Sequence, residues 1–348
     1  MKRIAFLTLF SLFSAIWCFA QADLQPAAIV NLTKSEPITV KQLRTEVERV
    51  EKARGGRALT KDERIQLLDV MINEKLVIQA AEKDKIVISE SEVNNQVQQL
   101  RATLAQQLGR QPTDAEFNEA VRKESGMDFP SFREQLRRQM IVQKYLLAKK
   151  EPMLKSVKEP TEAEIIEQYN LAKAQFVRPE TVRFSMIQVP YGPDAASKAK
   201  AKDLANSLLR EIGSNPSKFD EVVSKSKVPN SGYIAGDGGL LPRNHEAQNI
   251  VGQDFISTAF NLKQGEVSKL IEGNPGYQII KITENYSMKN LELDDIIQPG
   301  SNIRVRDYIK QALFNERQQS TLAKASEELI ADLRKGNPFR VYDNNLNW

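Results

Sequence analysis

A stretch of about a hundred residues, bounded by two strand-like runs, constrains what this chain can fold into more than any other feature. Residues 182–189 open the stretch and residues 276–282 close it, and both runs are rich in the β-branched and aromatic side chains that favour strands. A charged helical segment, a glycine-rich segment at residues 232–239 and the phrase Ala259–Leu262 lie between them. The stretch therefore predicts a module that mixes strands and helices.

A long helical region precedes this module. Its helix starts are marked by capping boxes, in which the hydroxyl of a Ser or Thr accepts a first-turn N–H and a Glu three residues later reaches back to the cap. The boxes are Thr60 with Glu63, Ser89 with Glu92, Thr113 with Glu116, and Thr161 with Glu164. Apolar residues follow each box at helical spacing on one side, which predicts amphipathic helices that pack on one another.

Short apolar segments near the two ends of the chain add further elements. Residues 28–32 and 38–40 flank a polar turn and predict a β-hairpin. Residues 303–335 predict a long helix that stops at the segment Gly336-Asn337-Pro338. The apolar residues 339–342 after this stop could add a strand.

Residues 1–20 have the pattern of a secretory signal peptide. Two basic residues precede an apolar run at residues 4–17 that is too short to span a membrane comfortably, and Ala20 ends a segment suited to cleavage. Cleavage after Ala20 predicts an exported, periplasmic chain. Lipid attachment at Cys18 is the disfavoured alternative, because Trp17 is bulky where such a site needs a small residue.

The charge balance argues against a nucleic-acid partner. Lys and Arg total 49 while Asp and Glu total 45, and loss of the two basic residues of the signal lowers the net charge from +4 to +2. These charges are mixed along the chain rather than gathered into a basic stripe. Cleavage would also remove the single cysteine, so the exported chain would form no disulfide.

The module resembles the parvulin family of peptidyl-prolyl isomerases. The resemblance rests on the order of its elements and on phrases at residues 259–262, 264–268 and 276–279. With the helices on either side, the chain resembles the SurA and PrsA group of exported chaperones, in which a C-terminal helix packs back against the N-terminal helices. The resemblance implies an α+β fold: a helical chaperone domain built from N-terminal and C-terminal helices, with an inserted parvulin-like module made of a small antiparallel sheet flanked by helices.

This resemblance also implies domain limits. We expect a signal peptide at residues 1–20, a SurA-N-like helical domain at 21–177, a PpiC-type parvulin-like domain at 178–286, and a C-terminal helix at 287–348 that returns to the N-terminal domain.

The resemblance places Met186 and Gln278 at the two positions where an active parvulin carries histidine. Rotation about an X-Pro bond has a barrier of roughly 18–20 kcal/mol, and lowering it needs an apolar socket and hydrogen bonds that favour the twisted state. Met has no hydrogen-bond donor, and Gln has a donor and an acceptor but does not titrate. We therefore expect weak or absent isomerase activity, with an active isomerase as the alternative.

By the same resemblance, the apolar socket for a proline ring maps to Val251 and Phe255, with Leu240 or Leu241 beside them. Val251 and Phe255 are four residues apart, which on a helix places both on one face. The alternative is that these residues belong to the ordinary core of the module.

Other chemistry finds little support. The single histidine, His245, lies in a polar loop away from both strand positions and is expected at plain surface. One histidine and no cysteine after cleavage disfavour a metal site and a histidine-dependent triad. The glycines of residues 232–239 lack the Lys-Ser/Thr pair of a phosphate-binding loop, so we interpret them as turn glycines and expect no cofactor.

These features predict an exported chaperone whose partners are unfolded or nascent envelope and outer-membrane proteins. One-sided helices can enclose an apolar groove that binds extended segments, although the same apolar stripes could be satisfied by packing within the chain. Whether the exported chain lies near the membrane is left open.

Overall fold

The computed structural model describes residues 24–348, which form two compact units. Unit 1 runs to Lys158 and includes Glu316–Trp348, and unit 2 is Glu159–Asn315. The predicted signal peptide, with its cleavage site after Ala20 and the alternative lipid site at Cys18, lies outside the described residues. The units divide at 158/159 and 315/316, whereas the expected domain limits at 177/178 and 286/287 follow the sequence resemblance and stay a prediction.

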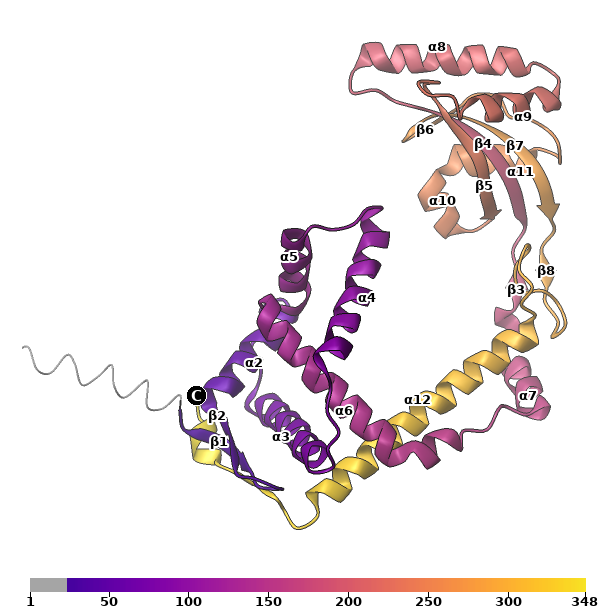
Figure 1. Ribbon diagram of the computed structural model, residues 1–348. Coiled ribbons are helices and arrows are strands. Elements are labelled where there is room, and N and C mark those ends of the chain that lie inside the picture. Colours follow the sequence, from indigo (N-terminus) through magenta and orange to yellow (C-terminus); the bar gives the residue numbers. More distant parts are fainter. Residues whose placement is uncertain (1–23) are drawn as a thin grey trace, which may run out of the picture. The chain divides into compact units, whose positions relative to one another are not determined.

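Unit 1 contains a run of helices between its N-terminal strands and its C-terminal segment (Figure 1). The helices are α2 (Val40–Ala53), α3 (Lys61–Lys83), α4 (Glu90–Leu108), α5 (Asp114–Ser125) and α6 (Phe129–Lys155). The capping boxes predicted for α3, α4 and α5 are confirmed, as is the box that starts α7 (Glu162–Ala172) in unit 2. At α4, the ammonium group of Lys144 and the cap residue Ser89 lower the pKa of Glu92 to about 2, so the capping carboxylate stays charged.

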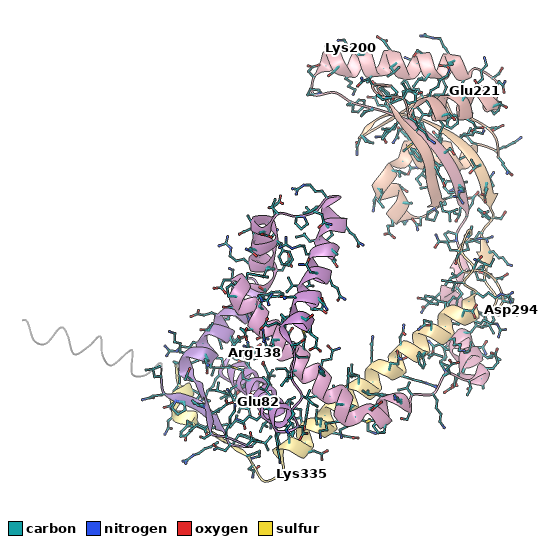
Figure 2. All side chains as sticks on the ribbon, viewed as in Figure 1. Glu82, Arg138, Lys200, Glu221, Asp294 and Lys335 are labelled. Atoms are coloured by element: carbon teal, nitrogen blue, oxygen red, sulfur yellow. The ribbon has the colours of Figure 1, made fainter. Side chains whose placement is uncertain are left out.

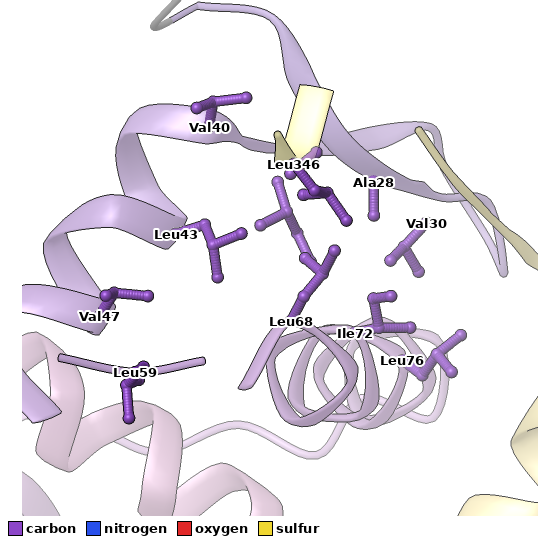
Figure 3. Close-up of a cluster of buried hydrophobic side chains, with 12 residues drawn as sticks. Ala28, Val30, Val40, Leu43, Val47, Leu59, Leu68, Ile72, Leu76 and Leu346 are labelled. Carbon is purple, nitrogen blue, oxygen red and sulfur yellow. The ribbon is translucent and has the colours of Figure 1, made fainter. Parts of the chain in front are cut away.

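A small sheet in unit 1 joins both ends of the described chain. Its strands, in the order β2-β1-β9, are β2 (Glu36–Thr39), β1 (Pro26–Val30) and β9 (Phe339–Val341). The predicted hairpin and the predicted C-terminal strand are therefore both confirmed, and every pairing is antiparallel. Figure 3 shows the core beneath this sheet, where Leu43 of α2 and Leu68 of α3 lie close to Leu346.

The long C-terminal helix α12 (Val305–Arg334) contributes its last turns to unit 1. Leu329 of α12 is buried in one cluster with Val77 of α3 and Tyr145 of α6. Lys150 of α6 also forms ion pairs with Glu328 and Asp332 of α12. N-terminal and C-terminal helices thus build one domain, and the predicted α+β fold class is confirmed.

Unit 2 is built on an antiparallel sheet with strand order β5-β4-β7-β6. Its elements are α7, a short 3-10 turn η1 (Lys173–Gln175), β3 (Val177–Arg178), β4 (Thr181–Pro190), α8 (Ala195–Ile212), α9 (Pro216–Lys225), β5 (Ile234–Pro242), α10 (His245–Val251), α11 (Gln253–Asn261), β6 (Ile271–Gly273), β7 (Gly276–Tyr286) and β8 (Lys289–Asn290). The runs predicted as strands at 182–189 and 276–282 are the two central strands, β4 and β7.

Helices cover both faces of this sheet (Figure 1). Ile187 of β4 and Ile279 of β7 lie in a cluster with residues of α8 and α9. Phe184 of β4 and Ile280 of β7 lie in a second cluster with residues of α10 and α11. The two faces follow from the alternation of side chains along each strand.

The glycine-rich segment corrects one prediction. Residues 232–239 were expected to form a turn, but strand β5 begins at Ile234 and includes Gly236, Gly238 and Gly239. A Cβ at Gly238 would come within 2.2 Å of the Phe184 ring, and Gly239 has φ +81° beside a shift in the strand register. These glycines serve close approach and a bulge within a strand, which a turn-based interpretation of the sequence misses.

Gln79 ties the β1–β2 turn to α3. Its side chain is fully buried, and its Oε1 accepts hydrogen bonds from the backbone N–H groups of Leu32 and Thr33, each at 3.1 Å. Its Nε2 donates to the carbonyl of Lys34 and to Glu36. Both the oxygen and the nitrogen of this buried amide therefore have hydrogen-bond partners.

We expect Gln79→Leu to lower the free energy of unfolding by about 2–4 kcal/mol, because it removes the four hydrogen bonds by which this fully buried amide holds the turn and Glu36. Urea unfolding followed by circular dichroism measures the loss. The matched control is Gln98→Leu on the exposed face of α4, which should change stability by no more than about 0.5 kcal/mol. Equal effects of the two substitutions would contradict the role given to Gln79.

Candidate functional site

The two positions predicted for catalysis lie on the same face of the unit 2 sheet. Met186 of β4 pairs in register with Ile280 of β7, and Gln188 pairs with Gln278. Because residues two apart on a strand share a face, Met186, Gln188, Gln278 and Ile280 all point toward the α10–α11 side. Met186 and Gln278 are thus diagonal neighbours across the two central strands.

Gln188 was not singled out from the sequence. It lies directly opposite Gln278 and gives this sheet face a second amide side chain. The signal that could have found it is the two-residue period of the predicted strand, counted on from Met186.

The residues predicted for a proline socket divide into buried and half-buried members. Phe255 is only 2 % exposed and packs edge-on against Phe184 at a ring-centroid distance of 5.4 Å. Leu241 is buried in the same cluster, while Val251 and Met186 are half-buried at its margin. Phe255 and Leu241 are thus buried core residues, and we call this pair the apolar floor, while Val251 and Met186 keep partly exposed surface.

Two expectations about the socket need correction. Val251 and Phe255 do not share one helix, because α10 ends at Val251 and α11 begins at Gln253. Gly252 between them has φ +90°, a conformation that breaks the helix. Leu240 precedes Leu241 on β5 and pairs with Arg183, so strand alternation places it on the opposite face of the sheet.

The side-chain oxygen of Gln278 is buried without a hydrogen-bond partner among the described residues. The residue is 7 % exposed, and its Oε1 has no partner among residues 24–348. A Cβ added to Gly273 of β6 would come within 2.7 Å of this oxygen, so the amide lies over the glycine. Leaving a buried acceptor unpaired costs about 1–3 kcal/mol.

The titratable residues Asp237 and His245 do not lie on the sheet face of Met186 and Gln278. Asp237 of β5 pairs in register with Ser185, on the face opposite Met186, and forms an ion pair with Arg183. The guanidinium of Arg183 lowers the pKa of Asp237, so this carboxylate is charged and already paired. His245 is exposed at the first position of α10.

No group of three or more His, Cys, Asp or Glu side chains that could hold a metal ion occurs within the described part of the chain. Over the same residues, no helix combines the length and apolar character needed to cross a membrane.

Unit 1 carries a second candidate surface. Two adjoining hollows of about 580 and 730 Å³ share Thr45, Glu46, Arg49 and Arg138 in their linings. Arg49 forms an ion pair with Glu46 at 2.6 Å, and Arg138, labelled in Figure 2, pairs with Glu74 at 2.9 Å. We call the smaller one the α2–α3 hollow.

The α2–α3 hollow also has apolar lining. Leu67, Val70, Met71 and Ile78 of α3 line it, and Val70 is 60 % exposed. The hollow therefore combines apolar side chains with charges that are largely paired among themselves, which suits uncharged or mixed polypeptide segments better than a polyanion.

Comparisons with known proteins agree with this architecture. One family model, the SurA-like N-terminal domain, matches residues 3–146, and another, the PPIC-type PPIASE domain, matches residues 160–298. The foldase protein PrsA of Clostridium botulinum (strain Hall) is 25% identical over 318 residues, covering 88% of this chain and 81% of the relative. A probable parvulin-type peptidyl-prolyl cis-trans isomerase of Bordetella bronchiseptica is 28% identical over 233 residues, covering 62% of this chain and 83% of the relative.

Among solved structures, one from a study of the SurA-like chaperones PEB4 and Cj1289 of Campylobacter jejuni matches with 15% identity and a TM-score of 0.36, covering 91% of this chain and 99% of that one. The family predicted from the sequence is confirmed by the two family models and the PrsA relatives. The chain belongs to the SurA/PrsA type of foldase and chaperone, with a SurA-like N-terminal domain and a parvulin-type peptidyl-prolyl isomerase domain.

Proposed function

We propose that this protein is a periplasmic chaperone that binds unfolded envelope or outer-membrane proteins, and that its parvulin-type domain has weak or no isomerase activity. The observation that carries the second part is the composition of the sheet face at Met186 and Gln278. The two positions implied for histidine hold a thioether and a neutral amide, which neighbour each other on one face. Neither side chain can exchange a proton near neutral pH.

Weak activity follows from what rotation about an X-Pro bond requires. An apolar floor at Phe255 and Leu241 supports desolvation of the bond. Met186 cannot donate a hydrogen bond to a twisted imide, and the side-chain oxygen of Gln278 lies close to Gly273 of β6. The domain can therefore bind a polypeptide segment while giving little preferential stabilisation to the twisted X-Pro bond.

The chaperone part of the proposal is supported by the α2–α3 hollow. Its exposed Val70 and its half-buried neighbours Leu67 and Met71 offer apolar contacts at the surface of unit 1. Unfolded segments present apolar side chains that such a surface can take up.

Export is supported by the sequence of residues 1–20, which carries the pattern of a signal peptide. We propose cleavage after Ala20 and a periplasmic location, with lipid attachment at Cys18 as the alternative.

The alternative function is an active peptidyl-prolyl isomerase that assists the folding of exported proteins. It is favoured by the match of residues 160–298 to the PPIC-type PPIASE domain. It requires that the apolar floor alone lowers the rotational barrier.

We expect the full chain to catalyse isomerisation of a proline peptide far more slowly than the double variant Met186→His/Gln278→His. Restored donors on an intact floor should raise the rate by about tenfold or more, since general acid–base and hydrogen-bonding groups contribute factors of that order. A protease-coupled or NMR exchange assay measures the rate. A high rate in the unmodified chain would reverse the ranking in favour of the alternative.

Substitution of Val70 by Glu should weaken suppression of aggregation of an unfolded outer-membrane protein by about threefold or more, because it places a charge in the apolar part of the α2–α3 hollow. Val87→Glu is the matched control, since Val87 is 65 % exposed and does not line the hollow. Light scattering during dilution from urea measures suppression. Equal loss in the two variants would contradict a binding role for the hollow.

Intact mass of the chain recovered after expression with its own N-terminus tests export. We expect a chain that begins at Gln21, and the same mass change in Cys18→Ser. Retention of residues 1–20, or a lipid-sized mass increase that Cys18→Ser abolishes, would contradict cleavage after Ala20.

A further inference from the structure

Residues 343–348, which we call the tail segment, pack against helices α2 and α3 of unit 1. Leu346 of this segment has only 4 % of its surface exposed. It lies in the buried cluster that contains Leu43 of α2 and Leu68 of α3, and Figure 3 shows these three side chains close together. The tail segment is therefore part of the core between the two helices and the small sheet.

Trp348 of the tail segment joins two arginines that belong to different helices. The guanidinium carbons of Arg44 on α2 and Arg64 on α3 both lie over the indole ring, each 4.8 Å from its centroid. Arg64 also donates a hydrogen bond to the backbone carbonyl of Trp348. A cation over an aromatic face is attracted by the quadrupole of the ring, and the attraction is stronger where water is partly excluded. All three residues are half-buried, so the ring links α2 to α3.

The same two helices form the α2–α3 hollow. Thr45, which follows Arg44, lines the hollow from α2, and Leu67, which lies about one turn after Arg64, lines it from α3. Ile38 of β2 lines the hollow as well, and it belongs to the buried cluster that the tail segment enters. Contacts of the tail segment thus help to set the spacing of α2 and α3, and the width of the hollow depends on that spacing.

Without the indole ring, the two arginines would oppose this arrangement. Each guanidinium carbon lies 4.8 Å from the same centroid, so the two lie within twice that distance of each other. Such a separation is comparable to the screening length of about 8–10 Å at ordinary ionic strength, so the like charges repel. The ring offers both cations a π face that offsets the repulsion. Its removal would therefore favour a larger separation of Arg44 and Arg64, and of the helices that carry them.

We propose that Trp348 is a positioning residue of the α2–α3 hollow: by bridging Arg44 and Arg64, it holds α2 and α3 at the spacing at which the hollow binds an unfolded segment. This role rests on the proposed function and deepens it, because it names the contact that regulates binding at the same hollow. Coupling between two sites is reciprocal. A bound segment therefore strengthens the contact of Trp348 with the two helices by the factor by which that contact strengthens binding.

The test uses a labelled, tryptophan-free peptide with the alternating apolar residues of an outer-membrane strand. Fluorescence anisotropy with the full chain measures its affinity. Trp348→Leu keeps an apolar side chain but removes the π face, and we expect it to weaken binding about fivefold or more, the low end of ordinary coupling between sites. Trp348→Phe keeps a π face and should retain most of the affinity. Arg64→Leu should weaken binding by a similar factor, and the double variant should lose no more than either one, because both changes remove the same contact.

Tyr342→Leu is the matched control. The guanidinium carbon of Arg340 lies 5.2 Å from the ring centroid of Tyr342, so this ring also contacts a cation. Arg340 belongs to β9, however, so this contact does not link α2 to α3. Tyr342→Leu should retain the affinity. All variants are compared at a temperature at which circular dichroism shows them folded, so that a loss of affinity does not report unfolding.

Hydrogen exchange tests the reciprocal effect, which a merely structural role for Trp348 would not produce. Exchange of the backbone amides of residues 342–348, followed by mass spectrometry, reports local opening of this segment. Saturation with the unlabelled peptide should slow this exchange about fivefold in the unmodified chain, the factor expected for affinity. The same peptide should leave exchange in this segment unchanged in Trp348→Leu.

Unchanged affinity in Trp348→Leu, an equal loss in Tyr342→Leu, or exchange in residues 342–348 that the peptide does not slow would overturn the inference. Aggregation suppression measured on the same preparations separates it from the proposed function. Suppression that is lost in Val70→Glu and kept in Trp348→Leu means that the hollow binds clients and that Trp348 does not position it. An unmodified chain that neither binds the peptide nor suppresses aggregation would contradict both.

Discussion

The two-residue alternation of side chains along β4 and β7 is the constraint on which the candidate site depends. It sends Ile187 and Ile279 into the core under α8 and α9, and it sends Met186 and Gln278 to the face of α10 and α11. A shift of one residue along either strand would move its side chains to the opposite face and place Met186 or Gln278 in the core under α8 and α9. The packing of the sheet and the composition of the site are therefore specified by the same register.

Two buried glutamines show opposite uses of the same side chain. Gln79 in unit 1 bonds to the turn between β1 and β2 with both ends of its amide, and so fixes local structure. Gln278 in unit 2 has an oxygen that no described residue satisfies. A buried amide with all its hydrogen bonds stabilises and specifies a fold, whereas an unpaired buried oxygen lowers the stability of the folded state.

Features governed by nearby residues could be predicted from the sequence, and features governed by distant contacts could not. The capping boxes depend on residues three apart, and the central strands on their own side-chain pattern, so both were predicted correctly. The need for a glycine at position 238 comes from the Phe184 ring, which is far away in the sequence. The break at Gly252, the outward side of Leu240 and the pairing of Gln188 with Gln278 depend on backbone conformation and register, which spacing alone does not give.

The C-terminal strand β9 completes the sheet that begins at β1, and the side chain of Asn345 donates to the carbonyl of Pro26 across a separation of 319 residues. Contacts this distant close a long loop before they gain any energy, which slows their formation. Unit 2 is one continuous segment of the chain, so all of its contacts can form before β9 is available. Unit 1 needs β9 from the C-terminal end of the chain to complete its sheet. A chain still being made or threaded would thus hold a finished parvulin-type module beside an open, unsealed hydrophobic sheet, and it would itself need protection from aggregation during that interval.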